Sequence, residues 1–265
     1  RPPRSTLLAS SAGSDVYKRQ VRDGVMETAD DSALFQSWGS ITIINPLEKI
    51  WNGYSDTRMG ASMDSYLNGY NDPRLPVYFQ PVTEGDNKGE YRGVANGMPN
   101  PQQDDYKAMS APNVQEKSTD SPLRWMMASE VAFLRAEGAM RGWTAEMGGT
   151  AEEFYNKGIE LSFLENGLSA DAAARYAADE TSKPTDFTDV SAANTKYNIS
   201  ALGKITIKWN AGASEEEQLE RIITQKWIAM FPNGTEAWSE FRRTGYPLIL
   251  SLIHISEPTR QAEIS

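Results

Sequence analysis

Residues 48–58, EKIWNGYSDTR, set two aromatic rings beside an amide, a carboxylate and a guanidinium. Trp51 and Tyr54 flank Asn52, and Arg58 follows a few positions later. Flat aromatic faces can stack on the apolar CH faces of a sugar ring, while amide, carboxylate and guanidinium groups bond its hydroxyls. Because the stretch has turn character, it is a candidate glycan-binding site. The structural alternative is that Trp51 pins this loop to the fold.

Other aromatic and polar residues in the same part of the chain are candidates for the same role. Trp38 and Tyr91 belong to this group, and its further members are Tyr106, Asp56, Asn96 and Asp105. Each has a structural alternative, since Trp and Tyr are mostly buried in proteins. We therefore place the ligand surface on these loops, with Trp51 and Tyr54 as the first residues to test.

The residue types that are missing exclude several kinds of chemistry. The sequence has no cysteine, and its one histidine, His254, lies in the C-terminal stretch SLIHISEPTRQAEIS. Cys/His nucleophiles, Ser-His-Asp triads and nearly every zinc or redox-metal site are thereby excluded between residues 21 and 250. Calcium on carboxylates and acid–base chemistry by a carboxylate pair stay open; otherwise we expect no metal, no cofactor and no catalytic residue.

Charge and motifs exclude further classes of partner. The formal net charge is −10 at pH 7, and no basic run is present. An acidic chain of this kind disfavours nucleic acid and anionic membrane surfaces as partners. No apolar run reaches the roughly 18 residues that a membrane helix needs. Phosphate-binding loops of the GxGxxG or GxxxxGK[ST] type do not occur either.

The two ends of the sequence lack helical and strand periodicity. Residues 1–20 and 251–265 resemble translated sequencing-library adaptor, so we exclude them from fold reasoning. The alternative is a pair of natural disordered tails. Between them we expect one partial domain over 21–250, an interior and C-terminal piece of a longer protein.

The domain divides into two unlike parts. Residues 21–120 are rich in Gly, Pro, Asn and Asp and form a loop-rich part. Short strands are predicted at 41–46 and 75–79. Apolar spacing between Met59 and Tyr70 predicts a short amphipathic helix.

Residues 121–250 form a helical part. Ser121-Pro122 predicts a helix start, and Gly142 a left-handed end. A capping box at Thr150 opens a second helix that stops at Asn166-Gly167. The short connection predicts an antiparallel helical hairpin of tetratricopeptide type. Further elements are predicted in this order: a helix over 169–180, a strand at 204–209 and a helix opened by a capping box at Ser214.

Residues 225–247, QKWIAMFPNGTEAWSEFRRTGYP, raise the question whether aromatic and guanidinium groups bind ligand or hold a scaffold. Helical spacing predicts a core-facing Trp227, with Lys226 at the core margin, and a buried Trp238. Arg242 and Arg243 fall in a last helical turn, where cations suit the helix dipole. A core-facing Arg242 needs a carboxylate such as Glu236 or Glu137. The scaffold interpretation explains the stretch better.

The same stretch resembles the C-terminal signature of the SusD/RagB family of Bacteroidetes surface lipoproteins. ASEVAFLRAEGAMRGW (128–143) and EEFYNKGIELSF (152–163) are similar to that family's helical pair. NDPRLPVYF (71–79) and GEYRGVANG (89–97) resemble its SusD-like branch. These matches come in the family's order and span nearly all of 59–248.

The resemblance implies a mostly α fold, in which tetratricopeptide-like hairpins support a loop-rich lobe: an incomplete SusD-like α/α superhelical fold. It implies a non-catalytic protein on the outer face of the outer membrane, tethered by a lipid whose anchor is missing from this fragment. Such a protein captures glycans or other nutrients and passes them to a TonB-dependent (SusC-like) transporter. Ligand contacts come from variable loops, and the Trp/Arg signature belongs to the scaffold.

Two other classes of function compete with this one. An α-helical glycoside hydrolase needs two acidic residues that flank the scissile bond, and Asp30-Asp31 and Asp104-Asp105 are adjacent pairs. We interpret both as solvated turns, because neighbours on a chain diverge in direction. A tetratricopeptide-type interaction scaffold would show a fixed repeat period, and the sequence has none.

Overall fold

The structure is a computed structural model that describes residues 24–37, 40–42, 45–98, 102–113 and 121–251. The chain forms two compact units, each built from separated segments. The helical unit comprises the described parts of Arg1–Leu34, Arg124–Ala178 and Lys208–Thr244, and the loop-rich unit those of Phe35–Leu123, Asp179–Ile207 and Gly245–Ser265. Residues 179–207 and 245–250 therefore join the loop-rich unit, although they lie in the half of the sequence predicted as helical.

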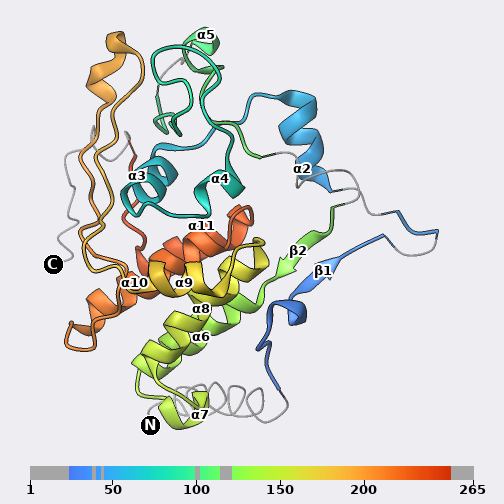
Figure 1. Cartoon of the computed structure of the whole chain (residues 1–265), viewed down its shortest axis with the longest axis vertical. Helices are drawn as coiled ribbons and strands as arrows, with labels where there is room; N and C mark the ends of the chain where they lie inside the picture. Colours follow the sequence, from blue (N-terminus) through green and yellow to red (C-terminus); the bar gives the residue numbers. More distant parts are fainter. Residues whose placement is uncertain (1–23, 38–39, 43–44, 99–101, 114–120, 252–265) are drawn as a thin grey trace, which may run out of the picture. The chain divides into compact units, whose positions relative to one another are not determined.

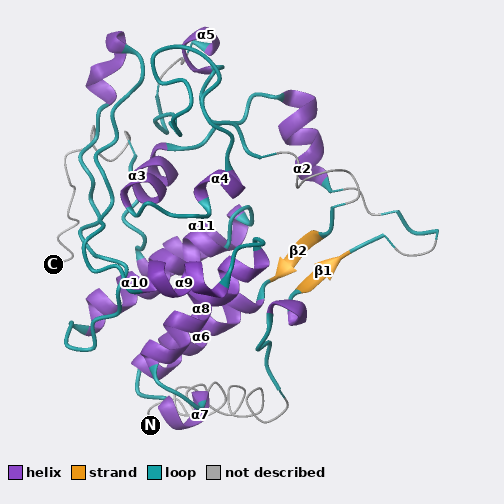
Figure 2. Ribbon diagram, viewed as in Figure 1, coloured by secondary structure: helices purple, strands orange, loops and turns teal. Residues whose placement is uncertain are grey.

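The helical unit is a group of packed helices, which Figure 1 labels and Figure 2 draws in purple. A 3-10 turn, η1 (Ala29–Asp31), precedes strand β1 (Ala33–Phe35), which pairs with β2 (Leu123–Met126). The helices are α6 (Ala128–Met140), α7 (Thr144–Met147), α8 (Ala151–Glu165), α9 (Ala170–Ala177), α10 (Glu215–Ala229) and α11 (Gly234–Thr244). Helix α8 packs against both α6 and α9, and α10 packs against α6, α8 and α11.

Helices α6 and α8 form the predicted hairpin. Phe133 and Tyr155 are fully buried and meet edge to face, with ring centroids 6.2 Å apart. Gly158 lets the helices approach closely, because a Cβ there would lie 2.7 Å from the Phe133 ring. The predicted signals for two helix ends are also present: Thr150 and Glu153 form a capping box, and Gly142 has a φ of +87°.

The loop-rich unit has short elements joined by long connections. They are α2 (Pro46–Glu48), the π-helical turn η2 (Lys49–Tyr54), α3 (Ala61–Gly69), α4 (Leu75–Tyr78), α5 (Gln103–Tyr106) and the 3-10 segment η4 (Ala192–Tyr197). Its core includes a cluster of Ala61, Ala95, Phe187, Ile199 and Leu250, which come from three distant stretches of chain. Because Thr185 N–H also donates to the Ser65 carbonyl (3.0 Å), the 179–207 excursion is tied to α3.

Four predicted elements differ in the structure. Residues 75–78 form helix α4 instead of the predicted strand. The fully buried ion pair between Asp72 and Arg74 turns the chain just before this helix begins. Residues 204–209 form no strand, and neither does the described part of 41–46, where Pro46 begins α2. The helix predicted from Ser121 begins only at Ala128, after β2. In addition, Asn233 precedes α11 as its capping residue, accepting from Glu236 N–H (3.3 Å).

Within the described residues no helix is both long and apolar enough to span a membrane. The same residues hold no group of three or more His, Cys, Asp or Glu side chains arranged to bind a metal ion.

Candidate functional site

A pocket of about 480 Å³ lies in the loop-rich unit, at the loops that the sequence analysis selected. Its lining combines charged, amide, hydroxyl and apolar groups from three stretches of chain, namely Ser55, Asp56, Arg58, Met59, Val94, Asn96, Gln102, Tyr106 and Lys107. This volume is within the range of pockets that bind small molecules. Such pockets have a mostly apolar lining with a few polar groups in defined positions.

Backbone hydrogen bonds hold these three stretches together beneath the pocket. Met59 N–H donates to the Ser110 carbonyl (2.8 Å), and Val94 N–H donates to the Met59 carbonyl (2.8 Å). Gly93 N–H donates to the Asp64 carboxylate (2.6 Å), which lies at the centre of α3 and is 5% exposed. Burial raises the pKa of Asp64, while this N–H and Arg92 act in the opposite direction. Main-chain hydrogen bonds and the Asp64 carboxylate therefore hold together the segments that line the pocket.

Arg58 fixes one wall. Its Nε and Nη2 donate to the Lys107 carbonyl (3.1 and 2.6 Å), and its Nη1 donates to Ser55 and Thr57 carbonyls (3.0 and 2.8 Å). Burial lowers the pKa of Arg58, and the charge of Asp56 offsets part of that effect. Because its partners are neutral carbonyls, the guanidinium keeps its positive charge at the pocket wall while clamping two loops together.

Tyr106 forms a second wall and is 5% exposed. Its hydroxyl lies 3.1 Å from each carboxylate oxygen of Asp189 and 3.2 Å from the Met98 sulfur. Asp189 is itself held by Asn198, whose amide oxygen accepts from Asp189 N–H (2.8 Å). The Tyr106 ring is thus positioned by a buried hydrogen-bond chain from the 179–207 excursion, and its hydroxyl is already committed.

The exposed side chains of Ser55, Asp56 and Asn96 offer polar groups to a ligand, beside the Arg58 charge. Lys107 also lines the pocket and pairs with Asp104 (3.1 Å). Among the described residues that line the pocket, Asp56 is the one carboxylate, whereas glycoside hydrolysis needs two that flank the bond. This arrangement can bind hydroxyl or amide groups of a ligand, and it lacks an acid–base pair.

One member of each acidic pair noted in the sequence has a structural contact. Asp31 accepts from Glu27 N–H and Thr28 N–H (2.9 and 2.8 Å) and closes the η1 capping box. Asp104 is the partner of Lys107, and Asp105 is exposed on α5.

Some of the residues predicted to bind ligand line this pocket, and others do not. Arg58 lines the pocket, as do three further members of the group, Asp56, Asn96 and Tyr106. Trp51 is 8% exposed and Tyr54 is 64% exposed, and neither lines the pocket. Tyr91 is half-buried and also lies outside the lining. Trp38 and the Asn52 side chain lie outside the described residues.

Sequence reasoning missed five lining residues, which are Ser55, Met59, Val94, Gln102 and Lys107. Val94 lies inside GEYRGVANG, a stretch singled out by resemblance alone. For the other four lining residues, the sequence offers one signal, which is that they lie near candidate residues, as Ser55 lies beside Asp56.

The Trp/Arg signature lies in the helical unit and differs in detail from its prediction. Trp227 is half-buried, and it is Lys226 that is fully buried (1% exposed), between Glu240 (3.0 Å) and Glu130 (3.6 Å). Trp238 was expected to be buried, yet it is 56% exposed and stacks on Phe241, with centroids 5.5 Å apart. The reason is that Glu240, about 200° around the helix from Trp238, takes the inward position to meet Lys226.

The arginines differ too. Arg242 is exposed, whereas Arg243 donates to both oxygens of Glu137 (2.7 and 2.6 Å) and to Glu240 (2.7 Å). These hydrogen bonds raise the pKa of Arg243. Burial alone would raise the pKa of Glu137, but hydrogen bonds from Arg243 and Arg141 hold it below its ordinary value. Glu137 is thus the partner of Arg243, not of Arg242, and the pair joins α11 to α6.

Solved structures share this fold. A SusD homologue from Bacteroides thetaiotaomicron is 42% identical with a TM-score of 0.80, over 91% of this chain and 48% of that one. A chitin-binding SusD homologue from Flavobacterium johnsoniae is 41% identical with a TM-score of 0.77, over 86% and 45%. A SusD homologue from Bacteroides vulgatus is 35% identical with a TM-score of 0.80, over 89% and 47%. The chain thus spans about half the length of these relatives.

A comparison with curated proteins finds no match. The family model described as SusD-like, "Susd and RagB outer membrane lipoprotein", matches residues 7–262. With the mostly helical fold and the identities above, this match confirms the resemblance read from the sequence. The chain belongs to the SusD-like family of SusD and RagB lipoproteins, which are proteins of the outer membrane.

Proposed function

We propose that this protein is a non-catalytic glycan-binding protein of the cell surface, which delivers its ligand to a TonB-dependent (SusC-like) outer-membrane transporter. Family membership supports glycan binding, and a relative that is 41% identical is a chitin-binding protein. The observation that carries the proposal is the convergence of Asp56, Arg58 and Asn96 on one pocket of the loop-rich unit.

The pocket's chemistry favours binding over catalysis. Asp56 and Asn96 offer a carboxylate and an amide to hydroxyl or acetamido groups, and Arg58 adds a fixed donor-rich edge that its carbonyl partners hold in place. A hydrolase would need a second carboxylate across the pocket. Tyr54 ends the turn η2, two positions before Asp56 in the sequence, and its exposed ring offers an apolar face for stacking.

The test is calorimetric titration with a chitin oligosaccharide and a panel of other soluble glycans. Asp56→Ala and Asn96→Ala are expected to weaken binding several-fold, because a lost hydrogen bond to a ligand is worth about 0.5–1.5 kcal/mol. Asp86→Ala is the matched control, since Asp86 is an exposed loop aspartate of the same unit outside the pocket. Equal affinity in all three variants would place the ligand elsewhere.

Two further measurements address catalysis and delivery. Chromatography of the incubated glycan should show no product; hydrolysis that survives repurification and is abolished by one Asp or Glu substitution contradicts the non-enzymatic part. For delivery, the protein isolated from its own cells should co-purify from outer membranes with a TonB-dependent transporter. If the protein purifies without such a transporter, the delivery proposal is contradicted and the glycan-binding proposal is not.

A further inference from the structure

Helix α11 carries Trp238 and both arginines of the Trp/Arg signature, and the one side chain that it buries is charged. All eleven of its residues are described, and among them only Glu240 is buried. Ala237 and Phe241 are half-buried, and Trp238 is 56% exposed. Most helices of a globular protein dock through a stripe of buried apolar residues. Because α11 lacks such a stripe in this chain, charge contacts carry much of its attachment.

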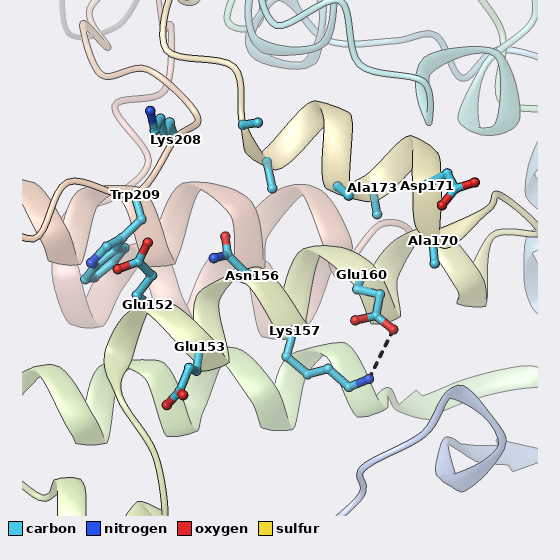
Figure 3. A pocket seen from close by; sticks show the side chains of 13 residues that line it. Glu152, Glu153, Asn156, Lys157, Glu160, Ala170, Asp171, Ala173, Lys208 and Trp209 are labelled. Atoms are coloured by element: carbon cyan, nitrogen blue, oxygen red, sulfur yellow. Dashed lines mark hydrogen bonds and ion pairs between the residues drawn. The ribbon is translucent and has the colours of Figure 1, made fainter.

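Two buried carboxylates on different helices share the ammonium group that holds α11. Lys226 of α10 is 1% exposed, and its Nζ lies 3.0 Å from Glu240 of α11 and 3.6 Å from Glu130 of α6. We call Glu130, Lys226 and Glu240 the α11 latch. Solvent screens them less than it screens the pair Lys157–Glu160 (3.2 Å), which Figure 3 marks on α8 and whose side chains are 41% and 38% exposed.

The latch holds more negative than positive charge. Glu130 and Glu240 lie on either side of one ammonium and repel each other, and Glu236, one helical turn before Glu240, adds a half-buried negative charge. The pKa of Glu130 is raised above its ordinary value, chiefly by burial. The Lys226 charge opposes this rise, whereas Glu236 and Glu240 add to it. Glu130 is therefore the member of the latch that takes up a proton as the medium becomes mildly acidic.

The other charged groups near the latch have partners of their own. Arg243 joins Glu240 (2.7 Å) to Glu137 of α6, and Arg141 also binds Glu137. Hydrogen bonds from both arginines hold the pKa of Glu137 below its ordinary value, so this second link between α6 and α11 keeps its charges at mildly acidic pH. Carboxylates on two further elements that pack against α6 accept from nearby N–H groups: Glu165 of α8 from Ser129, and Asp31 of η1 from Thr28.

We propose that the α11 latch is a proton-sensitive hold, in which uptake of a proton by Glu130 tightens α11 against α6 and α10 and loss of that proton loosens it. With Glu130 neutral, Lys226 pairs with Glu240 alone, and the repulsion between α6 and α11 disappears. With Glu130 charged, the ammonium is shared and α11 meets a second buried anion. This device belongs to the helical unit and does not depend on the proposed glycan pocket.

The direction of the effect follows from proton linkage. Release of α11 admits water to Glu130 and removes Glu236 and Glu240 from it, so the pKa of Glu130 falls toward its ordinary value. The docked helix thus binds a proton more tightly than the released one. Docking is favoured as the pH falls from neutral toward the ordinary pKa of a glutamate, about 4.3, and this gain is lost as the pH rises through the raised pKa of Glu130.

Hydrogen exchange of the full chain, followed by mass spectrometry at about pH 5.5 and about pH 7.5 and corrected for intrinsic rates, measures how often α11 opens. We expect the amides of 234–244 to be better protected at the lower pH, by up to about tenfold. Each pH unit over which Glu130 is protonated only in the docked state changes the equilibrium tenfold. Helix α9 is the internal reference, because its charged residues Asp171 and Arg175 are both exposed.

Three variants locate the effect. Glu130→Gln imitates the protonated side chain, so α11 should be as well protected at pH 7.5 as at pH 5.5. Glu236→Gln removes one repelling charge and should raise the protection at pH 7.5 by about twofold. Glu220→Gln is the matched control: burial also raises the pKa of Glu220, but its charged neighbours lie on α10 itself. This variant should leave the pH dependence of α11 unchanged.

The proposal is overturned if α11 and α9 gain protection by the same factor in the unchanged chain, since the whole fold then responds to pH. It is overturned as well if Glu130→Gln keeps the pH dependence of α11, or if Glu220→Gln abolishes it. Circular dichroism at both pH values checks the fold of each variant. Should Glu130→Gln fail to fold, the comparison of α11 with α9 in the unchanged chain and the result for Glu236→Gln decide the question.

Discussion

Two aromatic residues of the π-helical turn η2 have opposite environments. Trp51 is 8% exposed and Tyr54 is 64% exposed, although only two residues separate them. Trp51→Ala should therefore lower the free energy of unfolding by about 3–5 kcal/mol. Tyr54→Ala should change it by less than about 0.5 kcal/mol. Urea denaturation of both variants measures the difference, and equal losses would contradict these burials.

The same pair bears on ligand binding. Tyr54 stays a candidate for stacking on a sugar, because it is 64% exposed, although Lys49 Nζ lies over its ring at 5.9 Å from the centroid. Trp51 is better explained by the structural alternative stated for it from the sequence. A loss of glycan affinity in Tyr54→Ala at unchanged stability would add Tyr54 to the site.

The two neighbouring arginines of α11 provide a second prediction at this scale. Arg243→Gln removes a bidentate pair with the buried Glu137, and it should cost about 1–3 kcal/mol because that carboxylate is then left with fewer donors. Arg242→Gln is the matched control, since Arg242 is exposed like Arg243 but makes no ion pair among the described residues, and it should cost less than about 0.5 kcal/mol. A double-mutant cycle with Glu137→Gln gives the coupling.

An undiminished stability in Arg243→Gln would contradict the role of this pair. So would zero coupling to Glu137, because the cycle removes effects that belong to either side chain alone.

At the scale of elements, the sequence predicts helices well where local signals agree. The capping residues Thr150, Ser169 and Ser214 each accept from the backbone N–H three positions on, as their types favour. Gly142 has the expected left-handed conformation, and so does Gly167 after α8. These features depend on a few adjacent residues, so they can be read without tertiary contacts.

Other elements depend on contacts that the local sequence does not contain. Residues 204–209 alternate like a strand but do not form one; Ile205 and Ile207 are buried, and the Ile205 carbonyl accepts from the Tyr70 hydroxyl (3.2 Å). The inward turn of Lys226 is set by two carboxylates, one of them on α6. Burial in these places follows tertiary partners rather than periodicity.

The contact of α6 with α8 gives a prediction about an element. Gly158→Ala places a methyl group within 2.7–2.8 Å of three atoms of the buried Phe133 ring, so it should destabilise the chain by about 1–3 kcal/mol. Gly234→Ala is the control, because a Cβ there meets nothing within 4 Å and the position begins α11. That variant should be neutral or up to about 1 kcal/mol more stable. Thermal denaturation compares them, and a tolerated Gly158→Ala would contradict the close packing.

At the scale of the whole molecule, chain order and spatial order differ. Asp56, Asn96 and Tyr106 meet in one pocket, and the sequence analysis had grouped them only by type and by the loop-rich composition around them. The partner that positions Tyr106, Asp189, lies 83 residues further on, within the half predicted as helical. Nothing local marks Asp189 for this role. Pocket membership could thus be predicted in part, and its supporting contacts could not.

The last stretch of described chain returns to the loop-rich unit, and its removal tests that arrangement. Leu250 is 2% exposed in the cluster with Phe187 and Ile199, and its N–H donates to the Ser62 hydroxyl (2.9 Å). Removing residues 245–265 should lower the Tm by about 4–10 °C, since losing a buried Leu costs about 2–5 kcal/mol in a chain of this size. Leu250→Ala in the full chain should lower it comparably.

Removing only residues 252–265 is the control, and it follows from the sequence prediction that the C-terminal stretch adds nothing to the fold. Ser251 is kept so that the new carboxylate does not fall on the buried Leu250. This shorter chain should keep the Tm of the full one, measured by calorimetry at equal protein concentration. A Tm that falls as far as in the 245–265 deletion would assign residues 252–265 a stabilising role, while an unchanged Tm in both deletions would mean that Leu250 does not hold the cluster together.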